Sequence, residues 1–356
     1  MKKFKTLRII LLILLVLILG LGIFWNYEIS PMSKKDEKVT VTVGEGSVYS
    51  VGDTLYEKGL IRNKFIFKLY VKLNNIKSIK ASTYELNKNM RLRKIIEILA
   101  EGNSYNPDEI TITFKEGLNV RKIARLVEEK TNNSYDDFMN LMNDSTYIDS
   151  KISEYWFLTD EIKNPKIYYP LEGYLFPNTY AFHNKDVTVK EIVDTMLEET
   201  NKQLSKYKDR LNGKEGEIHK AMTLASIVEL EGATSTDRAS VAGVFVNRIN
   251  DGWSLGSDVT TYYYLKIDNF KESLNGNPNL TTCDGAYNTR CPSFIGLPVG
   301  PISNPGIESV DATFNYTKHN YYYFVADCNG KTYLNKDEVG HFNTINKLKN
   351  EDNWCV

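Results

Sequence analysis

The sequence predicts an α+β protein with a single apolar helix near its N-terminus, small α/β units after it, and a larger mixed α+β domain beyond them. Three observations support this prediction. Residues 9–25 form an uncharged apolar run, as a membrane-spanning helix requires. Two alternating strand patterns, Val39–Val43 and Ile110–Phe114, are each followed by a glycine turn and a helical pattern. Apolar helical segments then gather after about residue 166.

Length and charge narrow the functional classes. A chain of 356 residues has room for an anchor and two or three small domains. The net charge of −1, from 44 basic and 45 acidic side chains, argues against nucleic-acid binding, which favours a basic surplus. The 23 tyrosines suit contact with amphipathic ligands such as sugars, although Tyr is equally an ordinary core residue.

The N-terminal apolar run is interpreted as an uncleaved anchor. Residues 1–8 are basic, so they predict a cytoplasmic tail with the rest of the chain outside a single-pass cell membrane protein. The alternative is a cleaved signal peptide. That would need small residues near position 25, where Phe24-Trp25-Asn26-Tyr27 stand instead. Residues 26–38 are polar and are predicted to be a linker.

Two similar units are expected next, at residues 39–105 and 106–165. Val39–Val43 leads into a Gly44–Gly46 turn, and Ile110–Phe114 leads into a turn at Gly117, each followed by helical spacing. The units resemble LysM-like modules, which bind glycan chains. Glycan binding and a pure spacer role both remain open for them. Each is too small to bury a good core alone, so we expect them to pack together.

The third region, residues 166–356, is predicted to hold the functional site. Helices are expected at Val187–Leu204, Ile218–Leu230 and Ala239–Ile249. Gly, Pro, Asn and Tyr dominate after Trp253, as in loops over a groove. A closing hairpin is expected within 321–334, because Asn329-Gly330 is a strong turn signal between two strand patterns.

The cysteines all lie late in the chain, in the part assigned to the outside. They are Cys283, Cys291, Cys328 and Cys355, and the sequence allows three pairings without choosing among them. Neither a CxxC motif nor clustered His accompanies them, so we predict no zinc site, and no other metal or cofactor.

The segment Ala225–Gly232, ASIVELEG, carries two carboxylates at the end of an apolar helix. Glu229 and Glu231 are two positions apart, which is about 200° of helical rotation, so only one of them can face a given cleft. Apolar neighbours and the negative end of the helix dipole both raise a carboxyl pKa, which suits a proton donor. The alternative is a solvated terminal Glu.

Several further motifs accompany this segment in order. VAGVFVNR (241–248), LGSDVT (255–260), YNT (287–289) and GLPVGPISNPG (296–306) follow it, LEGYLFPNTY (171–180) precedes it, and YYFVAD (322–327) comes last. Together they resemble the endolytic murein transglycosylase family of the MltG/YceG type. The anchor and the LysM-like units fit the same architecture.

The resemblance implies a membrane-anchored lyase that cleaves MurNAc–GlcNAc β-1,4 bonds within nascent peptidoglycan during cell-wall elongation. It implies Glu231 as the catalytic acid, on a helix in a lysozyme-like site, and 1,6-anhydroMurNAc product ends. One carboxylate suffices because the attacking hydroxyl belongs to the substrate, whereas a hydrolase needs a second carboxylate. The resemblance also implies coupling to peptidoglycan synthases. A non-catalytic glycan-binding scaffold and a hydrolytic muramidase are the alternatives.

The resemblance implies substrate-binding positions as well. Their polar groups are expected to orient sugar hydroxyls or N-acetyl groups, with loop capping as the alternative role; they are Asp258, Thr260, Tyr287, Asn288 and Thr289. Glu229 is interpreted as a supporting residue behind Glu231.

Overall fold

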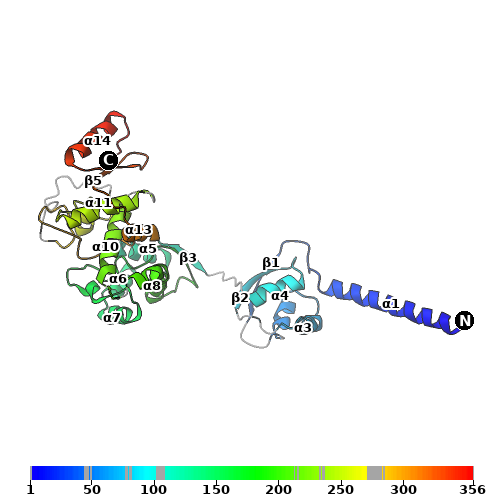
Figure 1. Cartoon of the computed structure of the whole chain (residues 1–356). Coiled ribbons are helices and arrows are strands. Elements are labelled where there is room, and N and C mark those ends of the chain that lie inside the picture. Colours follow the sequence, from blue (N-terminus) through cyan, green and yellow to red (C-terminus); the bar gives the residue numbers. More distant parts are fainter. Residues whose placement is uncertain are drawn as a thin grey trace. The chain divides into compact units, whose positions relative to one another are not determined.

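The computed structural model describes most of the chain. The chain divides into two compact units (Figure 1). Unit 1 is Met1–Asp108 and unit 2 is Glu109–Val356. The described residues are 2–43, 48, 50–76, 79, 82–101, 109–211, 213–214, 216–231, 234, 237–270, 283 and 285–355.

Helix α1 (Lys2–Glu28) begins unit 1, and its segment Leu11–Glu28 is long and apolar enough to cross a membrane. The aliphatic side chains from Leu11 to Leu19 are exposed, as expected for a surface that lipid covers. One such helix near an N-terminus is also compatible with a signal sequence.

The rest of unit 1 is built on a two-stranded antiparallel sheet. Strands β1 (Lys38–Val43) and β2 (Ser82–Asn87) pair along their whole length, and helices α2 (Val51–Glu57) and α3 (Lys64–Leu73) connect them. Helix α4 (Leu92–Glu101) follows. The core of the unit gathers one face of the sheet and the inner faces of the helices: Val41, Leu55, Phe67, Tyr84, Leu86, Ile95 and Leu99.

The division between the units at 108/109 lies close to the expected 105/106 boundary, and the segment 110–165 belongs to unit 2 together with the residues after 166. Strand β3 (Ile110–Thr113) pairs antiparallel with β4 (Thr179–Phe182). Helix α5 (Val120–Lys130) buries its apolar face in the same core as residues of α8 (Val189–Leu204). The local strand–turn–helix order is present, but a short strand and one amphipathic helix need these later elements to bury their apolar surface.

Unit 2 is mainly helical around α10 (Gly216–Leu230), which is buried continuously from Met222 to Val228 and packs against α11 (Arg238–Asn250) and α13 (Ile307–Phe314). The burial of every side chain from Met222 to Val228 fits a central helix. The remaining elements are α6 (Tyr135–Met142), α7 (Ser145–Glu154), η1 (Asp160–Lys163), η2 (Ser205–Tyr207), α9 (Lys208–Leu211), α12 (Asp258–Tyr264), β5 (Tyr323–Ala326), β6 (Thr332–Asn335) and α14 (Glu338–Asn350).

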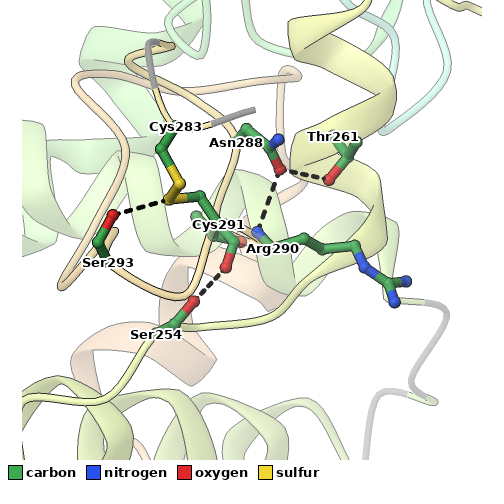
Figure 2. The surroundings of a disulfide bond; sticks show 8 residues. Ser254, Thr261, Cys283, Asn288, Arg290, Cys291 and Ser293 are labelled. Atoms are coloured by element: carbon green, nitrogen blue, oxygen red, sulfur yellow. Dashed lines mark hydrogen bonds between the residues drawn. A yellow bond between two sulfur atoms is a disulfide. The ribbon is translucent and has the colours of Figure 1, made fainter. Parts of the chain in front are cut away.

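Two disulfides and the hairpin complete unit 2. The hairpin expected within 321–334 is formed by β5 and β6, and Gly330 takes a φ of 78° between them. Cys328 pairs with Cys355, and Cys283 pairs with Cys291, which selects one of the three connectivities left open. Figure 2 shows the second of these bonds beside Asn288 and Arg290.

Candidate active site

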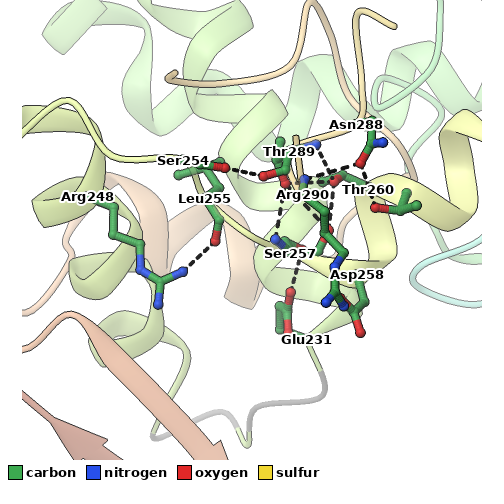
Figure 3. A network of polar contacts seen from close by, with 11 residues as sticks. Glu231, Arg248, Ser254, Leu255, Ser257, Asp258, Thr260, Asn288, Thr289 and Arg290 are labelled. Carbon is green, nitrogen blue, oxygen red and sulfur yellow. Dashed lines mark hydrogen bonds and ion pairs between the residues drawn. The ribbon is translucent and has the colours of Figure 1, made fainter. Parts of the chain in front are cut away.

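Glu231 stands immediately after the last residue of α10, and its backbone N–H still donates to the Ile227 carbonyl at 3.1 Å. Its side chain is half-buried, and the Ser257 hydroxyl donates a hydrogen bond to its Oε1 atom (Figure 3). The end of a rigid, buried helix and the loop before α12 therefore fix this carboxyl between them.

The carboxyl of Glu231 opens into a cleft of about 260 Å³. The walls come from α10, α11, the loop before α12, β5 and α14, and the lining residues are Glu231, Phe245, Arg248, Leu255, Gly256, Ser257, Asp258, Tyr323, Phe324 and His341. A carboxyl group, a guanidinium and aromatic rings thus share one small concave surface, which suits a polar ligand with apolar ring faces.

Burial raises the pKa of Glu231 to about 7. The negative charge of Asp258 contributes to this rise, while the Ser257 hydrogen bond and the positive charge of Arg248 oppose it. Near neutral pH the group can therefore both hold a proton and release it, as a general acid that later serves as a base requires.

Arg248 is held along one wall of the cleft. Its Nε donates to the Tyr322 carbonyl at 2.7 Å, and a terminal nitrogen donates to the Leu255 carbonyl. The guanidinium lies over the Tyr323 ring, 5.2 Å from its centroid. These contacts leave it little freedom, so Arg248 presents a fixed positive charge near the carboxyl.

Thr260, Asn288 and Thr289 were expected to touch substrate, but they are fully buried and do not line the cleft. Thr289 Oγ1 accepts from the Ser257 backbone N–H at 3.1 Å and lies 2.7 Å from Thr260 Oγ1. Asn288 Oδ1 accepts from the Thr261 hydroxyl at 2.8 Å. The hydrogen bonds of Thr289 and Thr260 therefore position Ser257, which in turn contacts Glu231 (Figure 3).

Tyr287 is likewise buried, and Asp258 alone of the five predicted binding residues lines the cleft. The Tyr287 ring packs against Tyr168 and Tyr263, with centroids 4.8 and 4.9 Å away. Asp258 begins α12 and pairs with Arg290 at the mouth of the loop. The YNT segment is thus buried behind the site and supports it, whereas Asp258 forms part of the cleft surface.

Gly256 allows the loop to reach this geometry. Its φ of 61° lies in the left-handed region that favours glycine, and its N–H donates to the Thr289 carbonyl at 2.9 Å. The Cys283–Cys291 disulfide ties the chain directly after Thr289 and Arg290 (Figure 2).

Glu229 faces away from the cleft, as the helical rotation predicted. Its Oε2 accepts from the Gly306 N–H at 2.9 Å and from the Ser309 hydroxyl at 2.8 Å, both at the start of α13. Its Oε1 pairs with Arg238, the first residue of α11, at 3.3 Å. Glu229 therefore joins three helices of the unit.

A second buried carboxyl supports the fold. Glu172 is 1% exposed and accepts from the Val120 N–H at 3.1 Å, from the Tyr263 hydroxyl at 3.1 Å and from the Asn304 amide at 3.0 Å. Burial raises its pKa to about 8. Glu172 links α5 to α12 and to the segment before α13, and it is not among the residues that line the cleft.

Residues 39–347 match the YceG-like family. The chain belongs to this family. A protein named endolytic murein transglycosylase from Streptococcus pneumoniae serotype 2 (strain D39) is 32% identical over 343 residues, covering 91% of this YceG-like chain and 62% of that protein. One of the same name from Bacillus subtilis (strain 168) is 31% identical over 329 residues, covering 91% and 89%.

A solved structure agrees with the fold of this YceG-like chain. The crystal structure of a YceG-like protein from Listeria monocytogenes is 34% identical and superposes with a TM-score of 0.60, covering 87% of this chain and all of that one. By contrast, the chain spans 62% of the length of the pneumococcal relative.

Four cleft residues with polar side chains were not singled out from the sequence as site residues: Arg248, Ser257, Tyr323 and His341. Three of them lie inside motifs quoted for the resemblance, so their position was a usable signal. His341 lies on α14, outside those motifs, and burial together with Arg248 lowers its pKa.

Proposed function

We propose that this protein is a membrane-anchored endolytic murein transglycosylase. It cleaves β-1,4 bonds between MurNAc and GlcNAc within nascent glycan strands, leaves 1,6-anhydroMurNAc ends and acts in cell-wall elongation. The observation that carries the proposal is Glu231, with its pKa near 7, at the end of a buried helix in a cleft. The names of the pneumococcal and Bacillus relatives support it.

In this proposal the carboxyl of Glu231 acts twice. The protonated group gives its proton to the glycosidic oxygen as the bond to MurNAc C1 breaks. The resulting carboxylate takes the proton of the MurNAc C6 hydroxyl, whose oxygen forms the new bond to C1. The proton count balances, the carboxyl returns to its starting state, and no water is consumed.

The remaining cleft residues support these two steps. Ser257 holds one carboxyl oxygen of Glu231, which leaves the other for the sugar. Arg248 supplies a fixed positive charge that favours the carboxylate formed after the first step. The YNT segment, with Thr260, is assigned a positioning role behind Ser257, and Glu229 a role in holding α10.

The outer parts of the chain complete the proposal. Helix α1 would span the cell membrane once, with its N-terminus in the cytoplasm and the cleft outside. Unit 1 is proposed to be a LysM-like glycan-binding module, because β1, α2, α3 and β2 follow in this order around one antiparallel pair. By binding a glycan strand, this module would direct Glu231 to bonds in the interior of that strand. We further propose that the protein works beside peptidoglycan synthases.

The experiment is mass spectrometry of products from un-crosslinked peptidoglycan strands, using the wild type and Glu231→Gln. Anhydro-ended fragments from the wild type alone would support the lyase and its acid. The variant should fold normally, because Gln can still accept the Ser257 hydrogen bond. Equal activity of the variant would remove Glu231 from its role, and no cleavage by the wild type would favour a glycan-binding scaffold.

A hydrolytic muramidase is the second candidate, because Asp258 places another carboxylate in the cleft. Hydrolysis would add water and give reducing ends. In the lyase, Asp258→Asn should keep anhydro products and lower the pKa of Glu231, since the Asp258 charge raises it. The decline of kcat/KM with rising pH would then begin at lower pH. Reducing-end products that vanish in Asp258→Asn would instead establish the hydrolase.

A further inference from the structure

The outer face of helix α3 in unit 1 carries two large exposed apolar side chains, in addition to the buried apolar face of the helix. Ile66, Phe67 and Val71 point into the core of the unit. On the outside, Phe65 is 69% exposed and Leu73 is 66% exposed. Isolated exposed side chains of this kind are common, so their meaning depends on what surrounds them on the helix.

Lysines flank this outer face. Lys68 and Lys72 are exposed on α3, within one turn of Phe65 and Leu73. Lys64, at the start of the helix, pairs with Asp53 at 2.9 Å. Apolar side chains interleaved with basic ones are typical of helices that lie in the interface of an anionic membrane.

The end of α1 is held against α3 and the segment before it. The Trp25 ring stacks on Tyr70 of α3, with centroids 6.3 Å apart. Arg62 lies over the Tyr27 ring at 4.6 Å and donates to the Ser30 carbonyl at 2.6 Å. These contacts fix the position of α3 relative to the C-terminal end of α1.

This arrangement sets the depth of α3. Trp and Tyr at the end of a membrane-spanning helix lie at the level of the lipid headgroups. Because Trp25 stacks on Tyr70, α3 must lie at the same level, within a helix diameter of about 10 Å. Its exposed side chains therefore lie within reach of the lipid headgroups.

We propose that the outer face of α3, namely Phe65, Lys68, Lys72 and Leu73, docks on the anionic outer surface of the membrane that α1 crosses. The inference rests on the membrane anchor of the proposed function. Phe65 and Leu73 enter the boundary between headgroups and acyl chains, and the two lysines contact lipid phosphates. Unit 1 is thereby held flat on the bilayer instead of moving freely above it.

The test uses the full chain in nanodiscs with a fluorescent label on Leu73→Cys, compared with Thr42→Cys, an exposed residue of β1 in the same unit. Selective labelling is feasible because the four native cysteines are paired in disulfides. Lipids carrying nitroxides near the headgroup should quench the label at position 73 several-fold more than the label at 42. Quenching should be stronger with phosphatidylglycerol than with phosphatidylcholine, and Lys68→Glu with Lys72→Glu should abolish that difference.

Three outcomes overturn the inference. A label at 73 that is quenched no more than the label at 42 means that α3 faces water. A blue-shifted label without nitroxide quenching means that a protein surface, such as a second copy, covers α3. A chain that does not float with lipid at all removes the anchor itself, and so separates failure of the proposed function from failure of α3 docking.

Discussion

The Ser257 hydroxyl donates a hydrogen bond to Oε1 of Glu231, joining the loop before α12 to the end of α10. This bond favours the ionised carboxylate and so lowers its pKa, against the larger effect of burial. Ser257 is itself held by Thr289 through its backbone N–H at 3.1 Å. The protonation of Glu231 therefore depends on a loop far from it in the sequence.

Ser257→Ala should raise the pKa of Glu231. A hydrogen bond to a charged group is worth about 1.5–3 kcal/mol and a pKa unit about 1.4 kcal/mol, so the alkaline limb of kcat/KM should move up by about one to two pH units. The maximal rate should fall, because the carboxyl is less firmly oriented. Ser254→Ala is the matched control, since Ser254 donates to the Thr289 carbonyl and not to Glu231. An unshifted limb in Ser257→Ala would show that this bond does not tune the acid.

Glu229→Gln should lower stability while leaving the chemistry in place. Its carboxylate has a side chain only 6% exposed and pairs with Arg238, so loss of the charge should cost about 1–3 kcal/mol of unfolding free energy. Glu308→Gln is the control, because Glu308 pairs with the same guanidinium from a side chain 57% exposed and should cost under about 1 kcal/mol. Urea denaturation and product assays well below the melting temperature measure the two effects. Loss of catalysis in a folded Glu229→Gln would contradict its supporting role.

Glu172 should make unit 2 less stable as pH rises. Its folded pKa of about 8 lies above the ordinary value of 4.5, so the folded chain retains a proton that the unfolded chain releases between these values. Stability gained from this group is fully present below pH 4.5 and declines through pH 8, by up to about 1.4 kcal/mol per pH unit. Urea titrations followed by tryptophan fluorescence should show this slope. Glu172→Gln should flatten it, and Glu217→Gln, which is exposed, should not.

We expect the Cys328–Cys355 disulfide to contribute more to stability and the Cys283–Cys291 disulfide to contribute more to activity. Chain-entropy arguments give about 2.5 kcal/mol for the 8-residue separation of Cys283–Cys291 and about 3.5 kcal/mol for the 27-residue separation of Cys328–Cys355. Replacing the second pair with serine should therefore lower Tm more. Replacing the first should lower kcat/KM more, because that bond ties the loop carrying Thr289 and Arg290. Equal activity of both variants would mean that the loop holds its shape without the bond.

The sequence predicted those parts of the site that depend on local geometry. An apolar run long enough for a helix predicted α10, and the 200° separation placed Glu229 and Glu231 on opposite sides. Burial of the YNT segment was not predictable, because polar residues in a loop carry no periodic signal. Ser257 was missed for the same reason: serine in a glycine-containing loop is an ordinary turn residue until the fold brings it to Glu231.

The sequence did not show that residues 110–165 share a unit with the residues after 166, because the pairing of β3 is not local. Val39–Val43 and Ile110–Phe114 have the same pattern, yet β1 finds its partner inside unit 1 while β3 pairs with a strand that begins at Thr179. Four residues of alternating sequence do not specify a partner across such a separation. The partner of each strand depends on which core can bury the apolar face of the helix that follows the strand.

The pairing of β3 with β4 decides where the protein can be cut. The Phe114 N–H donates to the Asn178 carbonyl. The Gly117 N–H donates to the Asn304 carbonyl, and the Asn304 N–H donates to the Leu118 carbonyl. Residues 110–118 are therefore bonded to two later segments of unit 2. A recombinant fragment starting at 166 would expose the edge of β4 and the apolar surface beneath α5, and we expect it to aggregate during expression. A fragment starting at 109 keeps all of these hydrogen bonds, and we would use it for crystallisation with a glycan.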